Sequence, residues 1–596
     1  MASPTNRFMG TALPRRSMLR GAGMGIAGLA GAALIGCGGG SSPAPSAPAS
    51  GSPAAAAASG APKNVVRAEG FDPKFGKVPV NLKKMIPGGK YVRASNDTSR
   101  ENDPDISAAG ADWEFVGDRL ATANGFTQKV TPDMLQSFEV ADPLNIILKL
   151  RPGIKTHNIA PMNGRVFTAK DVAFNIRRKA GLIDPKQAAA KYARYLQFDG
   201  VTDAIAVDDV TIKVTLSKPN GSIMAALSDP RANMLPIEAF DIGFKDPMKF
   251  VSTGAWIPTS YVDGTRQTFK ANKEYYRSFD EGGRPGVDTY EKLVIADRSS
   301  LVAAFISGQI DQLTGVRPEE EPQLNSSVPN AQMSLTPGPT WDNFAVNMKL
   351  PQFQDDRVRQ ALQLAMDYTA FSDPLGKGWL YSGPLHPMFP EATQSEELAK
   401  LPGYNPATKA KDIADAAKLM EAAGFKEGQG MGWKQINSNA SSLDSSVRTK
   451  DIYTKAFPKI AITLSTQSDY AQFTNNMNSR NFEGASKNHT SVPDIAADAM
   501  TYYHTKGGRN YQSYSKPWAD TLLEKLQQTV KREDKVALAR EFTLRYIKEG
   551  PPMLQLRVPP DNIANQSHVA GNDLVSGPWA YNSYQVSPRF VWFTEK

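Results

Sequence analysis

Ser513 and Lys516 have the spacing that first suggests catalysis, because they fit the Ser-x-x-Lys pattern of one class of serine hydrolases. In such enzymes the serine hydroxyl attacks a carbonyl carbon while a nearby base takes its proton. The Ser-Asp-Asn and Lys-Thr-Gly segments that accompany the pattern are missing from this chain. A loose four-residue pattern also arises by chance. We therefore expect a protein that is not an enzyme, and we keep a secreted serine hydrolase as an alternative hypothesis.

Metal-binding residue types show no spacing that points to a metal centre. The five histidines stand apart from one another, at His157, His386, His489, His504 and His568. None has the i, i+4 spacing with a glutamate that the helix of a zinc protease requires. Cys37 is the only cysteine in the sequence, which excludes an internal disulfide framework and a multi-cysteine zinc site. We expect neither a metal nor another cofactor.

Aromatic and polar side chains are better candidates for binding a small solute. Ligand pockets are mostly apolar and contain a few polar groups that fix the orientation of the ligand. The candidates by position are Asn96, Thr98, Thr253, Trp256, Trp341, Asn343, Asn488, His489 and Tyr502. Tyr503 is a further aromatic candidate. Asp494 could supply a carboxylate to a ligand, although an acid at a helix N-terminus is the simpler explanation for it.

Strands and helices that alternate along the chain must position these side chains. Apolar residues alternate over 145–150 and 210–216, which predicts two strands. Thr168 and Asp171 fit a capping box, which predicts that a helix begins there. Gly181 is a suitable end for this helix, because glycine readily adopts the left-handed conformation found after many helices.

Further strands are predicted from the alternation of apolar and polar residues, and further helices from the 3.6-residue period of apolar residues. Asp263-Gly264 predicts a hairpin turn. Strand-like runs cover 90–94, 256–261, 268–270, 341–348 and 553–558. Helical periodicity covers 300–306, 355–368, 411–424, 517–530 and 534–549. No repeat with a period of about 20–50 residues is visible, so the sequence predicts an α/β fold and not a solenoid.

The composition is that of a globular protein with a small net charge. Hydrophobic residues make up 41% and charged residues 21% of the 596 positions. Four arginines among the first 36 residues account for half of the formal net charge of +8, so the rest of the chain carries +4. This small excess comes without a long block of lysine and arginine, and we therefore expect no nucleic-acid partner.

The first 36 residues are expected to be an export signal. Arg15 and Arg16 stand in a segment that resembles the twin-arginine motif, and residues 34–37 (Leu-Ile-Gly-Cys) resemble the bacterial lipobox, whose cysteine receives a lipid. Residues 38–63 are almost only Gly, Ser, Pro and Ala, which is typical of a flexible linker. We expect a lipid on Cys37 to hold the exported chain at the membrane of the cell envelope. The alternative is that Cys37 is an apolar residue inside a membrane anchor.

A series of segments gives the chain a family resemblance. Residues 148–155 read Leu-Lys-Leu-Arg-Pro-Gly-Ile-Lys, and residues 164–172 read Gly-Arg-Val-Phe-Thr-Ala-Lys-Asp-Val. Later segments agree in their order along the chain: 252–256, 272–276, 304–311, 356–361 and 404–425. Together they resemble the extracellular solute-binding proteins of family 5, the oligopeptide- and dipeptide-binding group that serves ATP-binding-cassette importers. Residues 158–162 are an insertion between the first two of these segments, 148–155 and 164–172.

The resemblance implies a periplasmic-binding-protein-like fold. Two α/β lobes would be joined by a hinge of two crossings, near 334–343 and 550–558, with a ligand cleft between them. Hinge closure around the ligand is an established two-state mechanism. The implied division is an export signal at 1–36, a lipidated linker at 37–63, a first lobe at 64–335, a second lobe at 336–555 and a return to the first lobe at 556–596.

The resemblance also implies a function. The chain would be the substrate-binding lipoprotein of an ABC importer, a monomer that captures a peptide or other small solute outside the cytoplasmic membrane and delivers it to the permease subunits. In peptide-binding relatives an aspartate of the second lobe pairs with the peptide amino terminus, but residues 484–497 give no residue-by-residue match to that segment. The sequence therefore leaves the solute open. An envelope sensor or chaperone on the same fold is a further alternative.

Overall fold

The computed structural model describes most of the chain after residue 84. The described ranges are 65–67, 85–95, 103–106, 116–123, 130–192, 194–229, 231–277, 284–317, 319–337, 340–372, 382–438, 440–467, 470–492, 494–558, 560–570 and 591–594. Arg15, Arg16, Cys37, Asn96 and Thr98 lie outside these ranges. The expectations for these five residues therefore stay predictions.

The larger sheet contains, among the described residues, eight strands in the order β1-β13-β19-β12-β2-β11-β10-β9. Their bounds are β1 Val65–Arg67, β2 Lys90–Ser95, β9 Trp256–Val262, β10 Arg266–Ala271, β11 Thr289–Val294, β12 Gln312–Thr314, β13 Gln332–Pro337 and β19 Pro560–Asn565. β9 and β10 form the predicted hairpin around Asp263-Gly264. β19 pairs with both β12 and β13, so a C-terminal strand completes this sheet.

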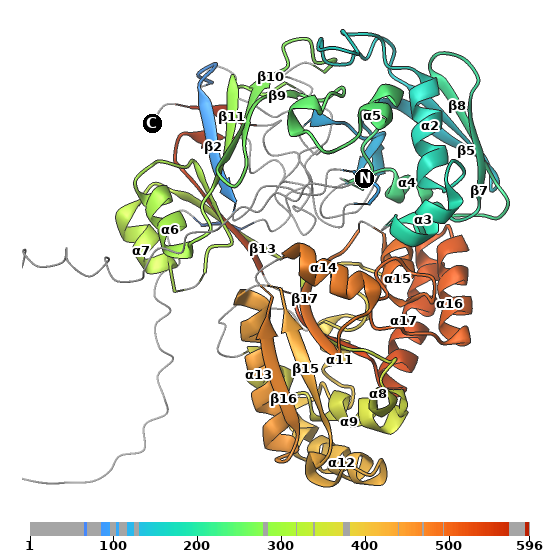
Figure 1. Cartoon of the computed structure of the whole chain (residues 1–596), viewed down its shortest axis with the longest axis vertical. Coiled ribbons are helices and arrows are strands. Elements are labelled where there is room, and N and C mark those ends of the chain that lie inside the picture. Colours follow the sequence, from blue (N-terminus) through green and yellow to red (C-terminus); the bar gives the residue numbers. More distant parts are fainter. Residues whose placement is uncertain are drawn as a thin grey trace, which may run out of the picture. The chain divides into compact units, whose positions relative to one another are not determined.

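A second sheet consists, within the described part of the chain, of five strands in the order β16-β15-β17-β14-β18. Their bounds are β14 Thr340–Val346, β15 Gly432–Asn437, β16 Ala461–Thr466, β17 Gly484–Thr490 and β18 Met553–Arg557. β15 is parallel to β16 and β17, whereas β14 is antiparallel to its neighbours β17 and β18. Helix α13 (Ala440–Ala456) packs on this sheet beside β15 and β16 (Figure 1).

A third sheet is antiparallel, with the described strands in the order β5-β6-β8-β7. The bounds are β5 Leu135–Asp142, β6 Asn145–Leu150, β7 Val201–Ala206 and β8 Thr211–Leu216. Helix α2 (Ala169–Lys179) covers one face of it (Figure 1). The backbone N–H of Thr168 donates to Asp171 Oδ2 at 2.9 Å, and Gly181 has φ of 73°. The predicted capping box and the glycine after the helix are both confirmed.

The predicted helices are present, with one correction. Besides α2 and α13, the α-helices of the described residues are α3 Pro185–Lys191, α4 Ile223–Ala226, α5 Ile237–Ile242, α6 Arg298–Ile306, α7 Glu321–Ser327, α8 Pro351–Gln354, α9 Asp356–Ala365, α10 Tyr368–Ser372, α11 Ser395–Leu398, α12 Lys409–Ala422, α14 Tyr470–Ser479, α15 Ile495–Tyr503, α16 Pro517–Gln528 and α17 Arg532–Lys548. The single helix predicted over 355–368 is wrong, because Met366 is extended (ψ of 118°) and separates α9 from α10. No helix among the described residues combines the length and apolar character needed to cross a membrane.

The chain passes between the two larger sheets twice. It leaves the eight-stranded sheet after Pro337 and enters the five-stranded sheet at Thr340. It returns between Arg557, where β18 ends, and Pro560, where β19 begins. The first passage lies inside the range expected for a crossing, 334–343. The second begins only at the end of its expected range, 550–558, and extends beyond it, because residues 553–557 form β18.

Candidate ligand-binding site

Polar and aromatic side chains gather at one edge of the five-stranded sheet. The carboxyl ends of β15, β17 and β18 lie at this edge, and so does the start of β14, because β14 runs antiparallel to β17 and β18. Ligands of α/β proteins commonly bind outside the carboxyl ends of strands. This edge is also where the chain enters from the eight-stranded sheet and returns to it.

Asp342 is the centre of the polar network at this edge. The buried carboxylate accepts hydrogen bonds from Asn488 Nδ2 at 2.8 Å, Arg557 Nε at 2.7 Å and Ser445 Oγ at 3.1 Å. These donors belong to β17, β18 and α13. Burial lowers the pKa of Arg557, while the Asp342 charge opposes that shift. Because one carboxylate joins three elements, the network holds this edge of the sheet in one geometry.

β14 supplies two further candidate residues, and both make hydrogen bonds to β17 or to the loop after it. Asn343 Nδ2 donates to the backbone oxygen of Lys487, and Trp341 Nε1 donates to Ser491 Oγ. Both side chains are buried. They hold the end of β17 and the loop after it in place.

A glycine sets the path of β17. A Cβ atom on Gly484 would lie 2.1 Å from Gln435 Oε1 and 2.6 Å from Trp433 Cδ1. Only glycine therefore allows β17 to pass this close to the side chains of β15. This close approach fixes the register that brings Asn488 and His489 to the carboxyl edge of the sheet.

Tyr502 of α15 organises the aromatic part of the site. Its ring stacks on His489 with centroids 4.6 Å apart, and it lies 5.8 Å from the ring of Trp341. The Tyr502 hydroxyl donates to the backbone oxygen of Thr490 at 3.0 Å and accepts from Arg509 Nη1 at 2.8 Å. Aromatic and charged groups from three segments are therefore held together by one side chain.

His489 has unused hydrogen-bonding capacity at both of its polar atoms, and the neighbouring Asn488 has it at Oδ1. Only 2% of the residue is exposed, and neither ring nitrogen has a hydrogen-bond partner. Burial, and then the charges of Lys487 and Arg509, lower the pKa of His489 well below its usual value of 6.5. The ring is therefore neutral at physiological pH and has one N–H donor and one acceptor nitrogen.

The structure brings together five of the nine predicted binding residues: Trp341, Asn343, Asn488, His489 and Tyr502. Thr253 and Trp256 lie elsewhere. Thr253 Oγ1 donates to Asp118 Oδ2 at 3.0 Å, and Trp256 is fully buried in a hydrophobic cluster with Tyr290. Both residues are buried away from the five residues above, and Trp256 Nε1 has no hydrogen-bond partner among the described residues.

Four residues of the site are absent from the sequence-based candidates: Asp342, Ser445, Arg509 and Arg557. Asp342 stands next to Asn343 in the predicted strand, and this adjacency was a usable signal. The other three lie on segments far apart in the sequence. No local pattern connects them, because their proximity depends on strand order.

Asp494 and Tyr503 have structural roles. The Asp494 carboxylate caps α15 by accepting from Ala497 N at 2.8 Å, as the simpler explanation expected. It also accepts from Ser222 Oγ at 2.6 Å and pairs with Lys535 Nζ at 3.0 Å. Burial favours the neutral acid, but Lys535 and these hydrogen bonds more than offset it, so the pKa is lowered. The buried hydroxyl of Tyr503 donates to a backbone oxygen.

The geometry at Ser513 and Lys516 does not match a Ser-x-x-Lys catalytic pair. Ser513 lies in a loop with φ of 60°, not on a helix where a lysine three residues later would face it. Lys516 precedes α16, and its Nζ pairs with Asp356 Oδ1 at 3.4 Å. The lysine is therefore directed to another carboxylate.

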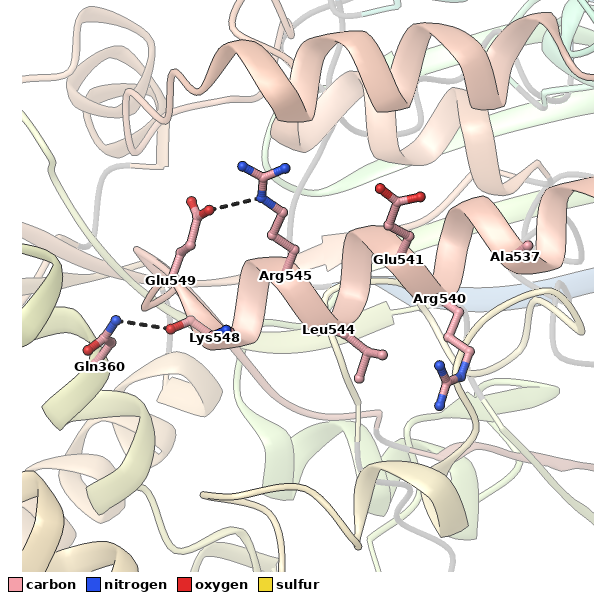
Figure 2. Close-up of a pocket in the computed structure, with 8 residues that line it drawn as sticks. All are labelled: Gln360, Ala537, Arg540, Glu541, Leu544, Arg545, Lys548 and Glu549. Carbon is pink, nitrogen blue, oxygen red and sulfur yellow. Dashed lines mark hydrogen bonds and ion pairs between the residues drawn. The ribbon is translucent and has the colours of Figure 1, made fainter.

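A groove lies along α17 and is lined mostly by side chains of that helix (Figure 2). Three of its charged side chains are already paired: Arg545 Nε lies 3.0 Å from Glu549 Oε1, and Arg540 Nη2 lies 2.7 Å from Glu397 Oε1. Gln360 Nε2 donates to the Lys548 backbone oxygen, as Figure 2 shows. Because three of the charged side chains of this groove are engaged in ion pairs, the carboxyl edge of the sheet is the better ligand-site candidate.

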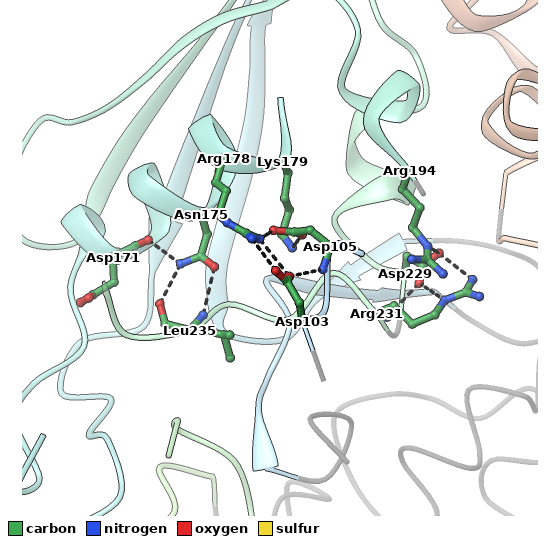
Figure 3. A network of polar contacts seen from close by, with 10 residues as sticks. All are labelled: Asp103, Asp105, Asp171, Asn175, Arg178, Lys179, Arg194, Asp229, Arg231 and Leu235. Carbon is green, nitrogen blue, oxygen red and sulfur yellow. Dashed lines mark hydrogen bonds and ion pairs between the residues drawn. The ribbon is translucent and has the colours of Figure 1, made fainter. Parts of the chain in front are cut away.

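Figure 3 shows two buried clusters of charged side chains. Arg178 pairs with Asp103 and Asp105, and Arg194 and Arg231 share Asp229. Burial lowers the pKa of Arg194 to about 9. Burial raises the pKa of both Tyr502 and Asp498, and the charge of Arg231 opposes that shift.

No group of three or more His, Cys, Asp or Glu side chains with metal-binding geometry occurs in the ranges that the structure describes.

Solved structures show which class of protein this fold defines. The ABC transporter-associated periplasmic binding protein DppA of Helicobacter pylori, in complex with the peptide STSA, has a TM-score of 0.74 at 19% identity, covering 86% of this chain and 99% of that chain. The murein tripeptide-binding protein MppA of Escherichia coli also has a TM-score of 0.74, at 16% identity over 86% of this chain and 100% of that chain. The fold is that of the two-lobed periplasmic binding proteins, as expected.

Residues 129–511 match the middle region of the bacterial extracellular solute-binding proteins, family 5, and the chain belongs to this family. The glutathione-binding protein GsiB of Pectobacterium atrosepticum is 26% identical over 295 residues, 46% of this chain and 52% of that protein. The oligopeptide-binding protein OppA of Escherichia coli is 26% identical over 314 residues, 49% of this chain and 54% of that protein. The chain spans about half the length of the curated relatives that it matches.

Proposed function

We propose that this protein is the substrate-binding component of an ABC importer. It captures a small solute outside the cytoplasmic membrane and delivers it to the permease subunits. The family match over residues 129–511 is the observation that carries this proposal. Relatives named for glutathione, oligopeptides and heme support a binding role for diverse small solutes, including peptides.

The solute binds at the carboxyl edge of the five-stranded sheet in this proposal. The first lobe comprises 64–335 and 556–596, and the second comprises 336–555. Closure occurs about the two passages at Pro337–Thr340 and Arg557–Pro560. The Asp342 network holds the carboxyl edge of the five-stranded sheet rigid during this motion, since it joins β14, β17, β18 and α13.

The N-terminal segment gives the protein its location. Arg15 and Arg16 direct export through the twin-arginine route, and Cys37 carries the lipid that holds the chain at the membrane. The motifs quoted from the sequence support this part of the proposal. The protein acts as a monomer without catalysis.

Thermal unfolding in the presence of solutes tests the function. A ligand that binds only the folded state stabilises it by about 2.7 kcal/mol at a concentration of 100 times its Kd. Screening the purified chain against peptides, glutathione, heme and organic acids should therefore raise the unfolding temperature for one class. Uptake of the same class should stop when the cognate permease is deleted. No shift in the whole screen, together with unchanged uptake after that deletion, contradicts the proposal.

A further inference from the structure

The imidazole of His489 has a hydrogen-bonding requirement that the protein does not meet. The residue is 98% buried, and both ring nitrogens lack a partner, although its neighbour Asn488 donates to Asp342. A buried polar group without a partner costs about 1–3 kcal/mol. Nearly all buried polar groups in native proteins are satisfied, so an exception calls for an explanation such as a ligand or a water molecule.

The position of the ring is fixed by its surroundings. Tyr502 stacks on one face at a centroid distance of 4.6 Å, and Tyr511 lies 6.4 Å away at an angle of 54°. Tyr502 is itself held by Thr490 and Arg509. The imidazole is thus oriented by the protein although its own nitrogens make no hydrogen bonds, which is the arrangement that a preorganised binding group requires.

The charges acting on the ring are positive. Lys487 and Arg509 both lower the pKa of His489, and Lys487 Nζ lies 5.1 Å from the centre of the Tyr511 ring. The nearby carboxylate of Asp342 is engaged by three donors. In a buried site of low dielectric, such a field strongly favours a negative charge on a ligand.

We propose that His489 is the solute-recognition residue of the second lobe and that its ring nitrogens pair with a solute that carries a carboxylate. This inference rests on the proposed binding function. The ring N–H donates to a carboxylate oxygen, and the other ring nitrogen accepts from a hydroxyl or N–H group of the same solute. Lys487 and Arg509 stabilise the carboxylate charge. The carboxylate can belong to a peptide C-terminus or to a non-peptide organic acid.

His489→Phe is the discriminating variant. Phenylalanine keeps a planar ring against Tyr502 and removes both nitrogens, so the unliganded variant should unfold at or above the wild-type temperature. Its affinity for a carboxylate solute should fall by about tenfold or more, because the bonds to the solute are lost. His489→Gln keeps one donor and one acceptor and should recover part of the affinity.

His568→Phe is the matched control. His568 Nε2 lies 3.0 Å from Asp311 Oδ1 near the eight-stranded sheet, away from the proposed site. This control should lower the unfolding temperature and leave solute affinity unchanged. The opposite pattern in the two histidine variants separates a role in recognition from a role in folding.

Calorimetric titration of the full mature chain uses three probes: trialanine, trialanine C-terminal amide and tricarballylate. Binding of trialanine but not its amide identifies a peptide carboxylate, and binding of tricarballylate alone identifies a non-peptide acid. Either result, with the loss in His489→Phe, supports the inference. Equal affinity of His489→Phe and wild type for the acid that binds, or measurable binding of trialanine and of its amide with equal affinity, overturns it and indicates water only at the ring nitrogens. If the acids fail but neutral or cationic solutes of the screen bind, the inference fails while the binding function stands. If nothing binds, both fail.

Discussion

Asp498 shows how burial determines the protonation of a single residue beside the site. Its carboxyl group is fully buried on α15, next to Ser491 and the backbone N–H of Val492. Burial raises its pKa to about 8, against the opposing effects of these hydrogen bonds and of Arg509. The folded protein therefore holds a proton that the unfolded chain releases above about pH 4.

Replacing Asp498 with asparagine should change the pH dependence of stability. Since the folded-state pKa is raised, the wild-type stability that comes from the retained proton is present at low pH and is lost as pH rises from about 4 to about 8, by at most about 1.4 kcal/mol per pH unit. Asp498→Asn should flatten this slope and gain stability relative to wild type at pH 8. Urea unfolding of both proteins at pH 5, 6.5 and 8 measures how the free energy of unfolding depends on pH.

Asp415→Asn is the control for this prediction. Asp415 is on the solvent side of α12, paired with Lys411 and Lys418. Its replacement should leave the slope between pH 5 and 8 unchanged. Parallel profiles for Asp498→Asn and wild type would show that Asp498 is already ionised in the folded protein.

At the scale of elements, a glycine contact joins the segment before α4 to the end of α16. Gly221 N donates to the Gln527 backbone oxygen at 2.9 Å, and a Cβ atom at position 221 would lie 2.5 Å from the Thr529 backbone oxygen. Nearby, Gln527 Nε2 donates to the Leu196 backbone oxygen at 2.8 Å. Two elements more than 300 residues apart in sequence therefore meet backbone to backbone.

Gly221→Ala should destabilise the protein by about 1–3 kcal/mol, because the added methyl group overpacks a contact formed by backbone atoms. Hydrogen exchange should rise at the end of α16 and in η2 (Tyr195–Phe198), where the contact is lost. Gly264→Asn is the control. Gly264 has φ of 62° and open space around its Cβ position, and asparagine tolerates that conformation. Equal effects of both substitutions would show that the close contact is not what matters.

At the scale of the whole molecule, the proposed function depends on location as well as on binding. A receptor that serves an importer must stay near the permease. A covalently attached lipid provides this by inserting its acyl chains into the membrane. The lipobox-like residues 34–37 and the linker at 38–63 suit a tethered receptor.

Cys37→Ala should release the protein from the membrane fraction while solute binding by the purified chain is unchanged. The physical reason is that the thiol is the proposed site of lipid attachment and the only cysteine of the sequence. Fractionation and mass measurement of the mature N-terminus check this. Ser41→Ala, four residues into the linker, is the matched control and should stay with the membrane. Persistent membrane association of Cys37→Ala would contradict lipid anchoring at this residue.

Much of the local structure was predictable because its causes lie within a few residues. The alternation that forms β6 and β8, the Thr168–Asp171 cap and the Asp263-Gly264 hairpin all depend on neighbours in sequence. The family assignment also followed from ordered segments. Helix α13 was missed, because its serine-rich sequence has weak helix propensity and its packing against the five-stranded sheet stabilises it.

The candidate site was predictable only in part. The sequence by itself determined that Trp341 and Asn343 share one strand and that His489 follows Asn488. Only the tertiary structure placed Ser445, Asn488 and Arg557 around Asp342, and Tyr502 against His489. The physical reason is that the Asp342 contacts join segments separated by about 100–200 residues, whose proximity is set by strand order and register. The contact of Tyr502 with His489 depends on how α15 packs beside the end of β17, and no period along a single chain encodes either arrangement.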